Sequence, residues 1–152
     1  MSLISISEAE LAIKTLLEPV GTSKNLEVAL FPETQESRGR AWVKDILLIG
    51  FVNESFSEPD QAPKLSLAKV PLRTTSTKTF ELILHVKRLR TYEGAYEILY
   101  AIREALHGAR ISPFTGPLYV TEVSFTELKD SRFWLWSITC KLDQNFVAGD
   151  CC

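Results

Sequence analysis

Apolar residues recur at helical spacing near the beginning of the chain, which predicts an amphipathic helix with one buried face. Ser7 is expected to cap this helix, with Glu10 completing a capping box and Leu11 contributing to a hydrophobic staple. Pro19 and Gly21 are expected to end it. The predicted buried stripe consists of Ala9, Ala12, Ile13, Leu16, Leu17 and Val20.

A second segment has the same spacing later in the chain. Thr91 is expected to cap this second helix, and Gly108 is a suitable residue for the position just after its end. The apolar residues between them fall on one side of a helix, so this helix is also predicted to bury a single face. Its predicted buried stripe consists of Ala95, Ile98, Leu99, Ile102 and Leu106.

Alternating or continuously apolar segments predict five strands, in a sheet whose last strand is the most distinctive. In that strand every second residue is apolar, which predicts that these residues share one face and that this face lies in the core. Phe133 and Leu135 point the other way, which indicates that a loop or another subunit partly covers the second face. The predicted strands are 26–31, 42–52, 77–90, 118–128 and 133–142, and the core residues of the last are Trp134, Trp136, Ile138, Cys140 and Leu142.

The resulting order is helix, three strands, helix, two strands. It predicts an α+β fold: a two-layer sandwich with a mainly antiparallel sheet of four to five strands and both helices on one face. We expect residues 1–152 to form one domain, because this length suffices for one good core. Residues 54–77 are expected to form a long loop or arm, and residues 145–152 a loose tail.

Composition narrows the function classes. Of the 152 residues 45% are hydrophobic and 24% charged, and 17 Lys and Arg face 19 Asp and Glu, giving a net charge of -2. This balance argues against a protein that depends on nucleic-acid phosphates, and no apolar run is long enough for a membrane helix. The beginning of the chain does not resemble a signal peptide. The three cysteines, Cys140, Cys151 and Cys152, are no disulfide framework and suggest a reducing cytoplasm.

The sequence contains no specific catalytic motif. The sequence has no phosphate-binding glycine loop, zinc-binding pattern, calcium loop or nucleophile elbow. His85 and His107 stand outside any motif, so structural roles are expected for both. The acidic residues Glu54, Glu58 and Asp60 could hold a hard cation loosely, but a solvated acidic loop is the simpler interpretation. We therefore expect no enzyme, no cofactor and no metal site.

The long loop is the most informative segment, because it is apolar and rich in proline yet too irregular to form its own core. Such a segment must lie against something, and a loop that crosses to a neighbouring copy would form a subunit interface. Basic residues in this loop and in the one before it fit a protein-facing surface better than a nucleic-acid groove. The candidate interface residues are Phe56, Pro59, Leu65, Leu67, Val70, Leu72, Arg38, Arg40, Lys64, Lys69 and Arg73.

Several blocks of the chain resemble a known family. They are ILLIGF followed by SFSEP, then YEILYAIREALHG, then GPLYVTEVSFTELKDSRFWLWSITCKL. The chain from about Leu26 to Leu142 resembles the Mu-like phage tail proteins of the tail-completion or tail-terminator kind. Phe125, Asp130, Trp134 and Trp136 carry the similarity together with the Gly-Pro-Leu-Tyr block at 116–119, whereas Ser131 stands where a glycine is expected.

The resemblance implies a small α+β protein that forms a hexameric ring on the end of a contractile phage or prophage tail. Such a ring stops polymerisation of tube and sheath and offers a surface for joining the head. The implied partners are further copies of the chain, the tail tube protein, the sheath and the head–tail connector, in the host cytoplasm during assembly and then in the virion tail. The alternatives are another neck or connector component, or a stand-alone ligand-binding regulatory domain.

Overall fold

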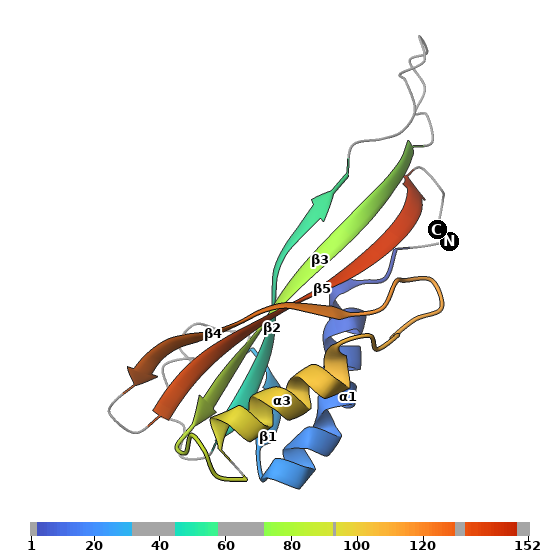
Figure 1. Cartoon of the computed structure of the whole chain (residues 1–152). Coiled ribbons are helices and arrows are strands. Elements are labelled where there is room, and N and C mark those ends of the chain that lie inside the picture. Colours follow the sequence, from blue (N-terminus) through green and yellow to red (C-terminus); the bar gives the residue numbers. More distant parts are fainter. Residues whose placement is uncertain (1–2, 32–44, 58–71, 93, 130–132, 149–152) are drawn as a thin grey trace.

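The computed structural model describes residues 3–31, 45–57, 72–92, 94–129 and 133–148. They form an α+β fold with the predicted order of helices and strands (Figure 1). The elements are α1 (Ile6–Lys24), β1 (Glu27–Leu30), β2 (Ile46–Phe56), β3 (Leu72–Val86), α3 (Ala95–Leu106), β4 (Tyr119–Lys129) and β5 (Phe133–Ala148).

The five strands form one sheet in the order β1-β2-β3-β5-β4. β1 pairs with β2 in parallel, and every other neighbouring pair is antiparallel. Both helices lie on the same face of this sheet (Figure 1). α1 contacts β1 and β2 near one edge, whereas α3 contacts β4 at the other edge. The two sheet edges are therefore covered by different helices.

The core lies between the helices and the sheet. The predicted stripe residues Ile13 and Leu17 of α1 and Ile98 and Ile102 of α3 are completely buried. On the sheet, the prediction that one face of β5 lies in the core is confirmed. Its five predicted core residues either belong to this cluster or pack against it. They pack with Phe80, Leu82, Leu84 and Val86 of β3 and with Leu47 and Ile49 of β2.

The opposite face of the sheet is also partly covered. Ile46, Leu48, His85 and Leu135 alternate with the core residues of their strands, so they point away from the helices. Each of them is at most 7% exposed. This confirms the expectation for Leu135, whereas His85, expected on a polar strand face, is buried.

The first helix begins and ends differently from the prediction. Its N-cap is Ser5, whose hydroxyl accepts a hydrogen bond from the backbone N–H of Glu8 at 3.1 Å. Ser5 and Glu8 have the same spacing as the predicted Ser7 and Glu10, so the sequence offers two overlapping capping boxes. With the helix beginning at Ile6, Leu11 makes no staple and is 54% exposed.

Pro19 and Gly21 lie inside α1, which ends only at Lys24. Asn25 then adopts the left-handed conformation with φ of 54°, and its N–H bonds the carbonyl of Gly21. Gly21 is needed for close packing, because an added Cβ would lie 2.7 Å from the carbonyl oxygen of Leu26. The glycine lets the chain turn back tightly from α1 into β1.

The second helix has Gly94, not the predicted Thr91, as its N-cap. Thr91 instead begins the preceding turn, since its carbonyl accepts the N–H of Gly94 at 2.8 Å. Gly108 follows the C-cap with φ of 88°, as predicted. The helix thus starts three residues later than a Thr91 cap would place it, and its predicted buried stripe is retained.

Strands β2, β3 and β5 each extend past their predicted bounds at one end. Residues 54–56 and 72–77, expected in the long loop, belong to β2 and β3, and residues 145–148, expected in the loose tail, belong to β5. These segments extend the sheet past both helices (Figure 1). We call this extension the arm: residues 53–56 of β2, 72–78 of β3 and 142–148 of β5.

Candidate functional site

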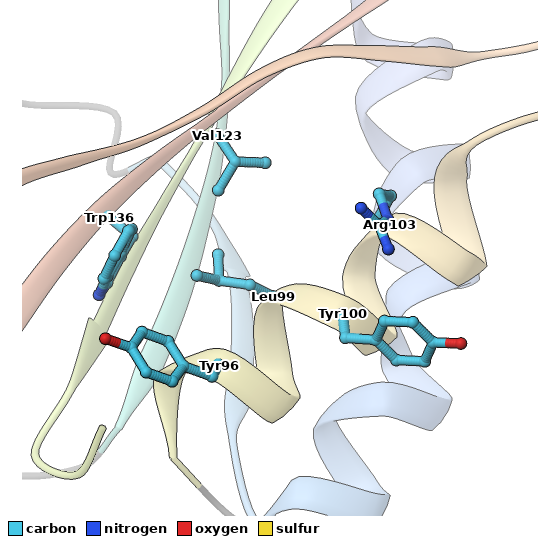
Figure 2. A pocket seen from close by; sticks show the side chains of 6 residues that line it. All are labelled: Tyr96, Leu99, Tyr100, Arg103, Val123 and Trp136. Carbon is cyan, nitrogen blue, oxygen red and sulfur yellow. The ribbon is translucent and has the colours of Figure 1, made fainter. Parts of the chain in front are cut away.

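The first candidate surface is an open groove between α3 and the edge of the sheet, here called the α3–β4 groove (Figure 2). It has a volume of about 310 Å³. Helix α3 contributes side chains four residues apart, which places them on one helix face, and β4 and β5 contribute the other wall. Its lining residues are Tyr96, Leu99, Tyr100, Arg103, Val123 and Trp136.

Aromatic rings hold this groove together. The ring centroids of Trp136 and Tyr96 lie 6.1 Å apart, and those of Trp136 and Phe125 lie 5.5 Å apart. Both pairs pack edge to face. Phe125 also contacts Trp134 at 5.8 Å. Such pairs add about 0.5–1.5 kcal/mol each beyond their buried area. Because Tyr96 and Phe125 remain 45% and 48% exposed, the cluster is an ordered apolar surface.

Two arginines lie over the tyrosines of α3. The guanidinium carbon of Arg103 is 5.5 Å from the ring centre of Tyr100, and that of Arg90 is 5.7 Å from the ring centre of Tyr96. These are cation–π distances. The stacking orders both arginines while leaving them exposed, so the groove combines an apolar floor with positive charge at its rim.

The arm forms a second candidate surface with a different chemistry. Lys78 is 2% exposed, and its ammonium donates to the Glu54 carboxylate at 2.9 Å. The hydroxyl of Ser76 donates to the same carboxylate oxygen. Burial alone would raise the pKa of Glu54, but the hydrogen bonds from Ser76 and Lys78 and the charge of Lys78 hold it below its usual value.

The opposite face of the arm is polar too. Asp143 accepts hydrogen bonds from the hydroxyls of Thr77, at 2.7 Å, and Tyr119, at 3.2 Å. Burial, with the charge and hydrogen bond of Asp143 adding to it, raises the pKa of the Tyr119 hydroxyl. Beyond these residues Phe56 and Phe146 contact edge to face at 6.0 Å. The arm is therefore stabilised largely by polar contacts and one aromatic pair.

The predicted interface residues that the structure describes belong to this arm. Phe56 is 55% exposed in β2 and Arg73 is exposed in β3. Leu72 begins β3. The remaining predictions, Pro59, Leu65, Leu67, Val70, Arg38, Arg40, Lys64 and Lys69, lie outside the described residues, as do Cys151 and Cys152.

Candidate catalytic and metal-binding residues are dispersed. His107 accepts the backbone N–H of Val120 on its Nδ1 at 3.1 Å, which ties the end of α3 to β4. Glu54, expected in a solvated acidic loop, instead pairs with Lys78 in the sheet. Among the described residues no group of three His, Cys, Asp or Glu side chains is placed to hold a metal ion. Neither described helix has the length and hydropathy that a membrane crossing requires.

The α3–β4 groove was not predicted from the sequence. Trp134 and Trp136 were expected in the core, and each is only partly buried; Trp134 contacts Phe125, and Trp136 contacts Tyr96 and Phe125. A signal was available in Tyr96 and Tyr100, whose spacing places both on the helix face next to the buried stripe. What the pattern could not supply is which strand lies opposite that face.

Comparison with known proteins returns a structural likeness alone. No protein-family model matches the chain, and no curated protein matches it in sequence. Among solved structures, the fold is similar to a chain of "Virion of native gene transfer agent (GTA) particle", with a TM-score of 0.55 and 10% sequence identity. The match covers 93% of this chain and 100% of that chain. At this identity the shared property is the fold.

Proposed function

We propose that this protein is a structural component of a phage-like virion, and specifically a tail terminator that forms a ring on the end of the tail tube. The observation that carries the proposal is the fold shared with a chain of a gene transfer agent virion over nearly the whole length of both. The blocks that resemble Mu-like tail-completion proteins support the same proposal, and they do so independently of the fold comparison.

The described surfaces are compatible with such a role. An assembly protein needs exposed, ordered surfaces for other proteins, and the α3–β4 groove and the tip of the arm both expose aromatic side chains. The arm extends the sheet past both helices, where it can reach a neighbouring molecule (Figure 1). In this proposal the chain has no catalytic activity and no cofactor, and it acts through protein contacts alone.

The proposed partners are further copies of the chain, arranged as a hexamer, and the tail tube protein, with the sheath and the head–tail connector next to them. The protein would assemble in the host cytoplasm and remain in the virion tail. A heterologous contact repeated around an axis closes into such a ring when its rotation divides a full turn.

The deciding experiment deletes the gene from a particle-producing host and examines the particles by electron microscopy. A terminator predicts tails of uncontrolled length that lack heads, and complementation with the wild-type chain restores normal particles. Tails of normal length that fail to join heads would instead identify another neck component. Unchanged particles would reject the virion role and favour a ligand-binding domain, for which the α3–β4 groove is the first place to test.

A further inference from the structure

The exposed side of α1 carries a stripe that is complementary to the α3–β4 groove. Glu8, Leu11, Thr15, Glu18 and Thr22 follow one another at helical spacing on the face opposite the core, and all are exposed. Leu11 is 54% exposed and lies between the carboxylates of Glu8 and Glu18 along this stripe. We call these residues the α1 stripe. It presents one apolar side chain between two negative charges.

The α3–β4 groove presents the reverse pattern. Its floor consists of Leu99, Val123 and Trp136, and its volume of about 310 Å³ accommodates a leucine side chain. Arg90 and Arg103 stack over Tyr96 and Tyr100, two lining residues that lie one helical turn apart. The groove therefore combines an apolar floor with positive charge next to it.

The spacing of the charges also agrees. Glu8 and Glu18 are ten residues apart on α1, which corresponds to about 15 Å along a helix. Arg103 and Tyr96, the ring that Arg90 covers, are seven residues apart on α3, or about 10 Å. The length of the arginine side chains bridges the difference, so one α1 stripe can engage both arginines while Leu11 enters the groove.

The two surfaces lie where a head-to-tail contact needs them. α1 contacts β1 and β2 at one edge of the sheet, and α3 contacts β4 at the other edge. The α1 stripe of one copy can therefore contact the groove of a second copy while its own groove stays open to a third copy. A contact between two different surfaces repeats from copy to copy and produces a ring or an open filament.

We propose that a second copy of this chain occupies the α3–β4 groove, inserting Leu11 between Tyr96, Tyr100 and Trp136 and pairing Glu8 and Glu18 with Arg90 and Arg103. This inference deepens the proposed function, on which it rests for the expectation of a ring. It assigns the contact to described helix surfaces, whereas the sequence interpretation assigns it to the long loop.

The test is a charge exchange measured by sedimentation velocity over a wide concentration range at low salt. One variant carries Glu8→Lys and Glu18→Lys, a second carries Arg90→Glu and Arg103→Glu, and a third combines all four changes. The matched control is Glu27→Lys on β1, an exposed carboxylate outside both surfaces and outside the arm, and circular dichroism verifies that each variant is folded.

We expect the wild-type chain to form a discrete oligomer, and each two-residue variant to weaken it by about tenfold or more in dissociation constant. The combined variant should regain the oligomer, and Glu27→Lys should leave it unchanged. A wild-type chain that stays monomeric, an oligomer that survives the reversals, or one that the combination fails to restore would each overturn the inference. The particle experiment remains independent, because tail length tests the proposed function whether or not this contact forms.

Discussion

At the scale of single residues, the arm depends on one buried cation. Lys78 is almost inaccessible, and the Glu54 carboxylate and the Ser76 hydroxyl are the groups around its ammonium. Glu54 is more exposed than Lys78, so the two partners are not equivalent. The alternating pattern predicts that residue 78 shares a face with Phe80, but a lysine in such a strand is usually placed on the solvent side. The ion pair therefore could not be predicted without knowing that β2 extends to Glu54.

The asymmetry predicts that Glu54→Gln destabilises the protein more than Lys78→Met. The first change leaves a buried ammonium without its counter-charge, which costs about 3–5 kcal/mol when fully buried and less here because Glu54 is partly solvated. The second leaves a carboxylate that water can reach and adds an apolar side chain of similar length. Urea denaturation of both variants at neutral pH measures the order, and equal losses would contradict it.

The same carboxylate predicts a pH dependence. The pKa of Glu54 is depressed in the folded protein, so its stabilising contribution is present above its unfolded value and is lost as the pH falls through the folded value. The difference in unfolding free energy between wild type and Glu54→Gln should therefore be constant near neutral pH. It should shrink once the pH falls below 4.5, the usual pKa of a glutamate carboxyl. A difference that grows on acidification would refute this role of Glu54.

Cys140 provides a third residue-level prediction. Its side chain is completely buried, and burial raises the pKa of its thiol to about 12. Since the thiolate is the reactive form, Cys140 should not react with a disulfide reagent at pH 8 in the native state. In a variant carrying Cys151→Ser and Cys152→Ser, we expect no thiol to titrate until urea unfolds the chain. Rapid labelling of the folded variant would show that the core opens around β5.

At the scale of elements, sequence patterns predicted which elements exist but not where they end. Both helices and all five strands were predicted because their apolar spacing is regular. The ends were wrong wherever two local signals competed, as at the overlapping Ser5 and Ser7 caps, or where tertiary packing decided. Pro19 was expected to stop α1, yet the helix continues to Lys24 because its buried face extends that far. The arm strands were missed because most of their residues are polar, so they show no regular apolar spacing.

The close approach of Phe31 to Gly50 leads to a prediction about how β1 is held on the sheet. An added Cβ would lie 2.1 Å from the ring of Phe31, so Gly50→Ala must displace this ring, which directly follows β1. We expect Gly50→Ala to cost about 1–3 kcal/mol in unfolding free energy, as overpacking does. In a Phe31→Ala background the same substitution should cost much less, which a double-mutant cycle measures. Additive effects would show that the glycine serves another purpose.

At the scale of the whole molecule, the candidate surfaces arise from strands and helices that are far apart in sequence. The α3–β4 groove joins residues 96–103 to 123 and 136, and the sheet order that brings them together is not encoded in any local pattern. Sequence reasoning placed Phe56 and Arg73 in a subunit interface. Both side chains lie exposed on the arm, and their contact with another subunit stays a prediction. The molecule thus divides into a body with an apolar core and an arm with a polar one.

This division predicts two levels of local stability. Opening the body exposes completely buried side chains such as Leu82 and Leu84, whereas opening the arm breaks mainly hydrogen bonds around Ser76 and Gln144. Backbone amides of residues 73–78 should therefore exchange with deuterium at least about tenfold faster than those of residues 82–86 of the same strand. Glu54→Gln should accelerate exchange in the arm selectively, while Ile13→Val, a core change in α1, should accelerate exchange in the body. Uniform protection along β3, with the same response to both variants, would mean that arm and body unfold as one cooperative unit and that the polar contacts of the arm stabilise the whole sheet.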